Sequence, residues 1–358
     1  MIVSRTPLRI SFAGGGTDLP AYYQHETGAV VSTAINKYIY ITVNEKFDHK
    51  IRASYSVTEI VDRVDQIKHE LIREALGLLN LDGGIEITSI SDIPSEGTGL
   101  GSSSTYTVGL LNALYAYAGQ NVGAERLGRE ASQIEIEICQ KPIGKQDQYI
   151  AAYGGLQYIQ FNADGTVFVD PIICSPETKL RLWQGLLLFY TGLTRSADRI
   201  LSEQKKNTET SPATRESLRK MALLARDMKE ALAANDLGCF GELLHQSWLE
   251  KRKMANGIST DQIDRWYACA RQHGALGGKI TGAGGGGFLL IFAPSERHRE
   301  IIRSLPELRP IPFRLEPQGS KIIYIEESAS NLRPVAEFPA PESSDRSRAT
   351  GLPVTTSL

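Results

Sequence analysis

The sequence has few of the residues that build disulfide frameworks or zinc sites. Its four cysteines, Cys139, Cys174, Cys239 and Cys269, lie far apart in a chain of 358 residues and show no CxxC spacing. Such cysteines are typical of reduced core residues in a cytoplasmic protein. The six histidines show no spacing typical of metal ligands either. The composition therefore argues against both a disulfide framework and a zinc site.

The chain also lacks an excess of one charge and a long apolar run. Its 39 Lys and Arg residues are balanced by 41 Asp and Glu residues, for a formal net charge of −2. No basic patch stands out, which argues against sequence-independent nucleic-acid binding. The longest apolar stretches are shorter than the ~20 residues of a membrane span, and MIVSRTPLRISF has no secretory-signal pattern. We therefore expect a cytoplasmic protein, and its length favours two domains.

The segment 94–104, PSEGTGLGSSS, has the pattern of an anion-binding loop. Its glycines and serines are followed by apolar residues at three- and four-residue spacing, which predicts a helix that begins near Ser102. Glycine permits close backbone approach to a ligand, and the free N–H groups at a helix N-terminus bind phosphate. The alternative is an ordinary flexible loop before a capped helix.

This loop is neither a Walker A motif nor a dinucleotide-binding motif. No GK[ST] closes it, no lysine lies within it, and its glycines are spaced two apart. The positive charge that phosphate requires must then come from Mg²⁺ or from a basic residue on another segment.

Two further glycine-rich segments flank this loop in the sequence. The segment 7–20, PLRISFAGGGTDLP, predicts a strand with Arg9 opposite its core face, followed by a glycine turn. Taken alone, Arg9 would be solvated. The segment 279–288, KITGAGGGGF, has more glycines than a plain hairpin needs. It predicts a close approach to a ligand or to the loop at 94–104.

Together, these three segments resemble the motifs of the GHMP kinases, a superfamily that includes galactokinase, homoserine kinase, mevalonate kinase and phosphomevalonate kinase. The resemblance covers about residues 3–330, and PSEGTGLGSSS is similar to the phosphate loop of the superfamily. Within it, the motifs AGGGTDLP, KPIGKQDQY and TGLTRSADRIL resemble those of bacterial D-glycero-D-manno-heptose 7-phosphate kinases.

The resemblance implies a two-domain α+β GHMP kinase fold. Residues 1–180 would form an ATP-binding half like domain 2 of ribosomal protein S5, and residues 181–330 a ferredoxin-like half. ATP and the sugar would meet between the two halves. Residues 331–358 are rich in Pro, Ser, Thr and charge, which predicts a tail without a packed core.

Periodicity predicts helices around residues 66–80 and 123–140 and mostly helical structure over residues 196–273. Ser259 followed by Gln262 predicts a capping box at the start of one of these helices. The segments PFRLEP and KIIYIEE predict the strands that complete the C-terminal half.

The resemblance also implies the catalytic and nucleotide-binding residues. Asp147, in PIGKQDQY, would accept the proton of the acceptor hydroxyl or hold that hydroxyl in line for attack. Arg9 would neutralise charge on the transferred phosphoryl group. The alternative role for Asp147 is that of a helix N-cap. The implied ATP-binding residues are Pro94, Gly97, Gly99, Leu100, Gly101, Ser102, Ser103 and Ser104.

A Mg²⁺ ion would be held by a hydroxyl and a carboxylate, together with nucleotide phosphates and water. The resemblance assigns these two groups to Ser103 and Glu135. Glu137 competes with Glu135, because QIEIEI offers two carboxylates. Lys145 is either a solvated loop charge or a phosphate contact.

The expected substrate site draws on three segments. Its residues are Gly16, Thr17, Asp18, Arg195, Arg199, Gly284 and Gly285. The first three would bind sugar hydroxyls, since a carboxylate accepts two hydroxyl hydrogen bonds well. The two arginines lie four residues apart and would bind the phosphate of a phosphorylated sugar if that segment is helical, although arginines at this spacing also pair with surface carboxylates.

The implied reaction is ATP- and Mg²⁺-dependent phosphorylation of the anomeric hydroxyl of D-glycero-D-manno-heptose 7-phosphate. The product would be the 1,7-bisphosphate, for nucleotide-heptose and surface polysaccharide synthesis. The enzyme would act as a monomer or homodimer. Two alternatives stay open, namely another sugar 1-kinase of fucose or galactose type and a non-catalytic ligand-sensing relative. Against the second, Arg9, Asp147 and the serine run are all present.

Overall fold

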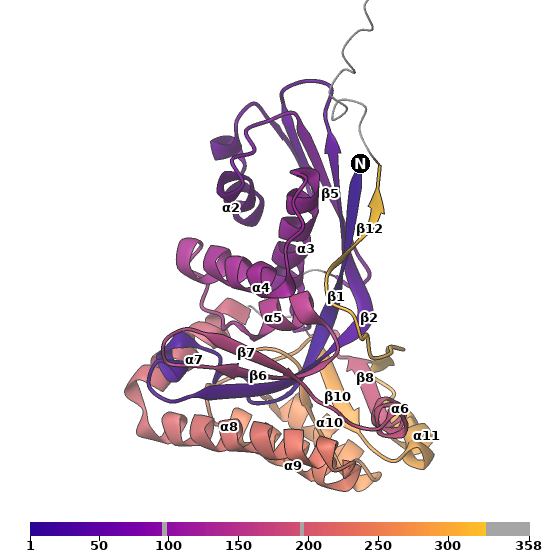
Figure 1. Cartoon of the computed structure of the whole chain (residues 1–358). Coiled ribbons are helices and arrows are strands. Elements are labelled where there is room, and N and C mark those ends of the chain that lie inside the picture. Colours follow the sequence, from indigo (N-terminus) through magenta and orange to yellow (C-terminus); the bar gives the residue numbers. More distant parts are fainter. Residues whose placement is uncertain (95–98, 194–196, 327–358) are drawn as a thin grey trace, which may run out of the picture. The chain divides into compact units, whose positions relative to one another are not determined.

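Figure 1 shows the computed structural model of the chain, which describes residues 1–94, 99–193 and 197–326. Residues Met1–Ile325 form one compact unit that contains two antiparallel or mixed β-sheets and the helices that cover them. Within the described residues, no helix combines the length and the apolar character that crossing a membrane requires.

The first sheet is built around two long antiparallel strands, β1 (Ile2–Ala13) and β2 (Gly28–Glu45). Among the described residues it has eight strands, in the order β12-β1-β2-β5-β3-β4, with β6 paired to β2 and β7 to β6. The other strands are β3 (Ile51–Ser54), β4 (Thr58–Val61), β5 (Ile85–Ser91), β6 (Leu156–Phe161), β7 (Val167–Pro171) and β12 (Lys321–Ile325). Only the β3–β5 pairing is parallel in this described sheet.

Both faces of β1 are covered, which differs from the half-solvated strand that the sequence predicts. The register against β2 shifts between Pro7 and Leu8, and such an irregularity re-aims the side chains that follow. The Arg9 side chain extends toward Asp147. Further along the strand, Phe12 packs edge-to-face on Phe240, with 5.2 Å between the ring centroids. Arg9 is only 3% exposed, so the expectation of a solvated arginine is wrong.

Helix α3 (Ser102–Tyr117) begins at the residue that the sequence predicts and packs against β1 and β2. Gly109 permits this close packing, because a Cβ atom there would lie 2.7 Å from Thr6 Oγ1. Three further helices contact α3. They are α2 (Glu70–Leu78), α4 (Ala124–Ser132) and α5 (Gln146–Tyr153). The helix predicted around 123–140 is α4 followed by a π-helical turn at Gln133–Ile138.

The second sheet has four antiparallel strands among the described residues, in the order β11-β8-β10-β9. They are β8 (Leu186–Tyr190), β9 (Gly277–Ile280), β10 (Phe288–Phe292) and β11 (Arg309–Pro310). The helices of this half are α6 (Pro176–Gly185), α7 (Ala197–Thr210), α8 (Pro212–Ala233), α9 (Leu237–Lys251), α10 (Asp261–Gln272) and α11 (His298–Ser304). The predicted helical character of residues 196–273 is therefore confirmed from residue 197 onward.

The C-terminal strands differ from the prediction. The strand in KIIYIEE is β12, and it pairs antiparallel with β1 of the first sheet instead of completing the second, as Figure 1 shows. The segment PFRLEP forms no strand, and a single bridge joins Leu315 to Ile35. The edge of β1 carries unpaired backbone groups, and β12 satisfies them. The chain thus returns to the sheet in which it began.

The predicted capping box is displaced by one residue. Thr260 is the N-cap of α10 and accepts a hydrogen bond from the Ile263 N–H at 3.3 Å. Ser259 instead donates to Asp264 Oδ1 at 2.6 Å. The prediction of Ser259 as the capping residue is therefore wrong, although the helix itself starts where a cap was expected.

Candidate active site

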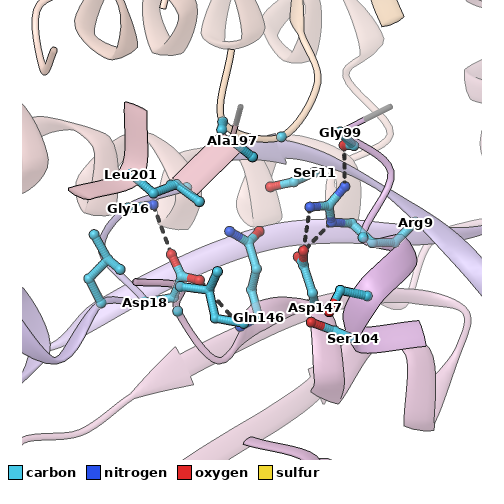
Figure 2. Close-up of a pocket in the computed structure, with 18 of the residues that line it drawn as sticks. Arg9, Ser11, Gly16, Asp18, Gly99, Ser104, Gln146, Asp147, Ala197 and Leu201 are labelled. Carbon is cyan, nitrogen blue, oxygen red and sulfur yellow. Dashed lines mark hydrogen bonds and ion pairs between the residues drawn. The ribbon is translucent and has the colours of Figure 1, made fainter. Parts of the chain in front are cut away.

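A cavity of about 510 Å³ lies where the three glycine-rich segments of the sequence meet. Figure 2 shows its lining, with Arg9 and Asp147 paired on one side and Asp18 beside Gly16 on the other. The first part of the lining comes from the two N-terminal glycine-rich segments and comprises Arg9, Ser11, Gly15, Gly16, Asp18, Leu19, Gly99, Gly101, Ser102, Ser103 and Ser104. The remainder comprises Lys141, Ile143, Gly144, Gln146, Asp147, Ala197, Asp198, Leu201, Lys251, Lys279, Gly282 and Ala283.

The third glycine-rich segment packs directly on the phosphate loop. A Cβ atom on Gly282 would lie 2.6 Å from the Cα of Gly99, and one on Gly99 would lie 2.5 Å from the Thr281 carbonyl oxygen. Both glycines have a positive φ, which side chains disfavour. The expectation of a close approach between residues 279–288 and the loop is confirmed.

Arg9 and Asp147 form a bidentate ion pair in this cavity. Arg9 donates from Nε to Asp147 Oδ1 and from Nη2 to Oδ2, each at 2.6 Å, and its Nη1 donates to the Gly99 carbonyl at 2.6 Å. The backbone N–H of Arg9 donates to the Leu100 carbonyl at 3.1 Å. Paired parallel bonds of this kind fix direction as well as distance. The arginine therefore holds Asp147 and the phosphate loop in one arrangement.

Asp147 does not cap a helix. Helix α5 begins at Gln146 with Lys145 as its N-cap, and no side chain forms a cap hydrogen bond there. The Asp147 carboxylate lies in the first turn of α5 and faces Arg9 in Figure 2. The structure therefore excludes the N-cap alternative and leaves this carboxylate at the cavity.

Glu135 lies beside Ser103 in the interior. It accepts hydrogen bonds from Ser103 Oγ at 2.5 Å and from Gln148 Nε2 at 2.6 Å. Burial raises the pKa of Glu135 to about 7, although hydrogen bonds from Ser103, Ser104 and Gln148 act in the opposite direction. Glu137 is exposed on the same π-helical turn, so only Glu135 of the two candidates contacts the serine run.

Asp18 presents a buried carboxylate to the opposite side of the cavity. Its Oδ1 accepts the Gly16 N–H at 2.8 Å, and its Oδ2 accepts the Gln146 N–H at 3.3 Å. Burial raises the pKa of Asp18, and the negative charge of Asp147 adds to this effect. These two bonds orient the carboxylate and leave lone pairs for a ligand.

Thr17 does not reach the cavity. Its hydroxyl is fully buried, lies 2.8 Å from the Gly14 carbonyl and 2.9 Å from the Ala29 carbonyl, and accepts the Ala29 N–H at 3.0 Å. These contacts join the glycine turn to the start of β2. The structure therefore gives Thr17 a structural role in place of the predicted contact with sugar hydroxyls.

Several other predicted residues lie away from the cavity lining. Arg199 is exposed on α7, where Ala197, Asp198 and Leu201 face the cavity instead. Gly284 and Gly285 pack on Ile258, whose carbonyl accepts the Gly285 N–H at 2.9 Å. The structure thus brings none of these three predicted substrate residues to the cavity.

The predicted nucleotide-binding residues are only partly at the cavity. Pro94 is exposed, and Leu100 is a core residue that contributes its carbonyl to Arg9. Lys145 donates to the Gly165 carbonyl at 3.0 Å and lies over the Tyr23 ring, so neither role expected for it holds. Gly97 and Arg195 lie outside the described residues.

Sequence reasoning missed two buried lysines at the cavity. Lys251 ends α9 and Lys279 lies in β9, and they are only 4% and 2% exposed. Burial lowers the pKa of Lys251 to about 8. Burial, and after it the positive charge of Lys251, lowers the pKa of Lys279 to about 7. A lysine at a helix end is usually solvated, so no sequence signal marked Lys251.

Comparison with known proteins agrees with this geometry. The GHMP kinases N terminal domain matches residues 64–155, and the GHMP kinases C terminal domain matches residues 228–308. The D-glycero-alpha-D-manno-heptose 7-phosphate kinase of Campylobacter jejuni is 31% identical over 316 residues, which are 85% of this chain and 93% of that protein. The chain belongs to the GHMP kinases. It is therefore a phosphotransferase of a family that uses ATP, as the sequence motifs predict.

Other GHMP kinases extend the similarity. A mevalonate kinase of Methanothermobacter thermautotrophicus is 30% identical over 74% of this chain and 83% of its own length. The crystal structure of a D-glycero-D-manno-heptose 1-phosphate kinase from Bacteroides thetaiotaomicron superposes with a TM-score of 0.75 at 26% identity, covering 91% of this chain and all of that one. The predicted two-domain α+β fold is confirmed.

We expect Gly144→Ala to disturb the site through Asp18. A Cβ atom at Gly144 would lie 2.0 Å from Asp18 Oδ2 and 2.7 Å from the Asp18 carbonyl oxygen, so the carboxylate must move. Displacements of about 1 Å can reduce turnover by about 10². Steady-state kinetics should show a loss of at least ten-fold in kcat/KM for the phosphoryl acceptor, with the KM for ATP unchanged.

The matched control is Gly123→Ala, because Gly123 has a negative φ and no atom within 4 Å of a Cβ built there. This variant should behave like the wild type. Wild-type kinetics for Gly144→Ala would contradict the expectation that Asp18 binds the acceptor.

Proposed function

We propose that this GHMP kinase transfers the γ-phosphoryl group of ATP to the anomeric hydroxyl of D-glycero-D-manno-heptose 7-phosphate. The observation that carries the proposal is the Asp147 carboxylate, which Arg9 holds beside the phosphate loop in a cavity large enough for a sugar. The choice of sugar rests on the similarity to the Campylobacter jejuni heptose 7-phosphate kinase. The product would be the 1,7-bisphosphate, together with ADP.

In this reaction Asp147 accepts the proton of the C1 hydroxyl while the oxygen bonds to the γ-phosphorus and the bond to the β-phosphate oxygen breaks. Both carboxylate oxygens already face Arg9, so the acceptor hydroxyl shares one of them. Arg9 also stabilises charge on the phosphoryl group as it is transferred. Gly99, Gly101 and the serines at the start of α3 would cradle the phosphates with their backbone N–H groups.

The residues present fit a Mg²⁺ ion at Ser103 and Glu135. A hydroxyl and a carboxylate are oxygen ligands of the kind that Mg²⁺ prefers, with nucleotide phosphates and water completing its shell. The Glu135 carboxylate is fully buried, and among the described residues no Lys, Arg or His nitrogen lies within 4.0 Å of it. The ion would supply charge neutralisation on the nucleotide phosphates when bound. By accepting the Ser103 hydroxyl hydrogen bond, Glu135 would orient the Ser103 oxygen toward the Mg²⁺ ion.

The sugar would occupy the side of the cavity lined by Gly16 and Asp18. A buried carboxylate with two backbone donors accepts hydroxyl hydrogen bonds strongly, which suits a polyol. Asp198 at the start of α7 lines the same cavity and would add a second acceptor. These contacts would place the anomeric hydroxyl against Asp147.

The acceptor panel is the decisive experiment. ADP release should be measured with heptose 7-phosphate, heptose 1-phosphate, unphosphorylated heptose, L-fucose and D-galactose. We expect kcat/KM to be highest for the 7-phosphate by about two orders of magnitude, since charged contacts contribute about 1.5–3 kcal/mol each.

Two other results would replace the proposal. Equal or faster turnover of fucose or galactose would identify a different sugar 1-kinase. No ADP release with any of these acceptors would show that none of the tested sugars is the substrate.

Asp147→Asn tests the catalytic role. The change keeps the size of the side chain and removes the base, so we expect kcat to fall by about 10²–10⁴. The affinity for ATP should stay within a few-fold, because Asp147 contacts the acceptor. Asp82→Asn, at an exposed aspartate, is the control. A kcat near that of the wild type would refute the assignment.

Glu135→Gln tests the metal site. It should raise the Mg²⁺ concentration that gives half-maximal activity by at least about ten-fold, since even groups that only support a metal ligand contribute about 10–100-fold in affinity. Glu137→Gln changes an exposed carboxylate two residues away and should leave the Mg²⁺ requirement unchanged. The opposite pattern would assign the metal to Glu137.

A further inference from the structure

Two buried lysines share one region of the cavity, although they come from different elements. Lys251 is the last residue of α9, Lys279 lies in β9, and both line the cavity. Each side chain is at least nine-tenths buried. Both ammonium groups contact backbone carbonyls of residues 12–15, Lys251 that of Gly15 and Lys279 that of Phe12.

Neutral acceptors are the hydrogen-bond partners of these ammonium groups. Lys251 Nζ donates to Gln204 Oε1 at 2.9 Å and to the Gly15 carbonyl at 3.4 Å. Lys279 Nζ donates to the Phe12 carbonyl at a long 3.5 Å. Within residues 1–94, 99–193 and 197–326, no carboxylate oxygen lies within 4.0 Å of either nitrogen. An ammonium has three donors, so both groups retain hydrogen-bonding capacity.

Such an arrangement is costly in the absence of a ligand. A buried cation loses its hydration, and here the loss is only partly compensated. The Asp18 carboxylate favours the charged form of both lysines but forms no ion pair with either, and the positive charge of Arg9 disfavours it. The cost is offset when an anion enters the cavity. The contacts of Lys251 favour the phosphate of the acceptor, because Lys251 donates to the Gly15 carbonyl in the glycine turn that precedes Asp18.

A serine on β1 supplies a further polar group in the same cavity. Ser11 is 4% exposed, lines the cavity, and its Oγ has no hydrogen-bond partner among the described residues. Figure 2 shows Ser11 on the strand between the Arg9 pair and the glycine turn. A buried hydroxyl without a partner indicates a ligand atom at this position.

We propose that Lys251 and Lys279, assisted by Ser11, bind the phosphate that the acceptor sugar already carries and thereby select phosphorylated sugars over unphosphorylated ones. This inference rests on the proposed function and names the residues that determine its specificity. It assigns to buried lysines the role that the sequence suggested for Arg195 and Arg199. The exposed Arg199 does not line the cavity.

The test compares Lys251→Met and Lys279→Met with Lys253→Met. Methionine keeps most of the length and apolar surface of lysine, and Lys253 is a solvent-exposed lysine paired with Glu250 just after α9. We expect each cavity variant to lower kcat/KM for heptose 7-phosphate by about ten-fold or more. Activity on unphosphorylated heptose and the KM for ATP should change less than three-fold, and Lys253→Met should match the wild type.

Two kinetic outcomes would overturn the inference. An equal loss with phosphorylated and unphosphorylated heptose would show that the lysines only support the fold. A selective rise in the KM for ATP would assign them to the nucleotide. Thermal denaturation should show that both variants fold, because each change removes a buried charge that no carboxylate pairs. Lys251→Met should be the less stable of the two, since it leaves the buried Gln204 Oε1 without its donor.

A binding measurement separates this inference from the proposed function. With a non-hydrolysable ATP analogue occupying the nucleotide site, inorganic phosphate should raise the melting temperature of the wild type and of Lys253→Met. It should have no effect on Lys279→Met. If heptose 7-phosphate is not a substrate, the proposed function fails, and this measurement alone decides the lysine site. An equal shift in all three proteins would reject it.

Discussion

The candidate active site depends on the ion pair between Arg9 and Asp147. Arg9 is on β1, Asp147 is on α5, and the third arginine bond reaches the Gly99 carbonyl of the phosphate loop. One side chain thus joins three segments that lie more than 45 residues apart in the chain. A bidentate pair in a partly dehydrated cavity has a narrow range of geometries. Arg9 therefore fixes the position of the Asp147 carboxylate relative to the phosphate loop.

The cavity and the interior directly behind it contain more ionisable groups than they pair. Arg9 and Asp147 neutralise each other, whereas Asp18 and Glu135 are held mainly by neutral donors and the two buried lysines by neutral acceptors. Burial raises the pKa of both carboxyl groups and lowers the pKa of both lysines, so each of them is less stable in its charged form than in water. Buried ionisable groups without charged partners are expected in a site whose ligands bring several charges, such as a phosphorylated sugar and a metal-bound triphosphate. Binding of such charged ligands would offset the free energy that these groups lose when they are buried.

Local pattern and family resemblance predicted the parts of the site that lie within motifs. The sequence predicted the helix at Ser102, the presence of Arg9 and Asp147 in one site, the choice of Glu135 as the carboxylate beside Ser103, and the contact between two glycine-rich segments. What could not be predicted depends on the tertiary fold. Arg199 lies on the exposed face of its helix. The Thr17 hydroxyl forms hydrogen bonds with the backbone and is not available to a ligand. Lys251 is buried because α9 ends against the glycine turn, and nothing local in its sequence indicates this. The domain boundaries at residues 180 and 330 stay predictions.

The return of the chain to its first sheet has a consequence for how the molecule is divided. Because β12 covers β1, the N-terminal sheet is discontinuous in sequence, and the second sheet with its helices is inserted between two of its strands. A fragment that stops after the first half would leave the backbone of residues 2–5 of β1 unpaired along this edge. Such an edge recruits other chains, so truncation would favour intermolecular pairing over an independently soluble half. The strand that carries Arg9 is therefore completed only by the C-terminal part of the same polypeptide.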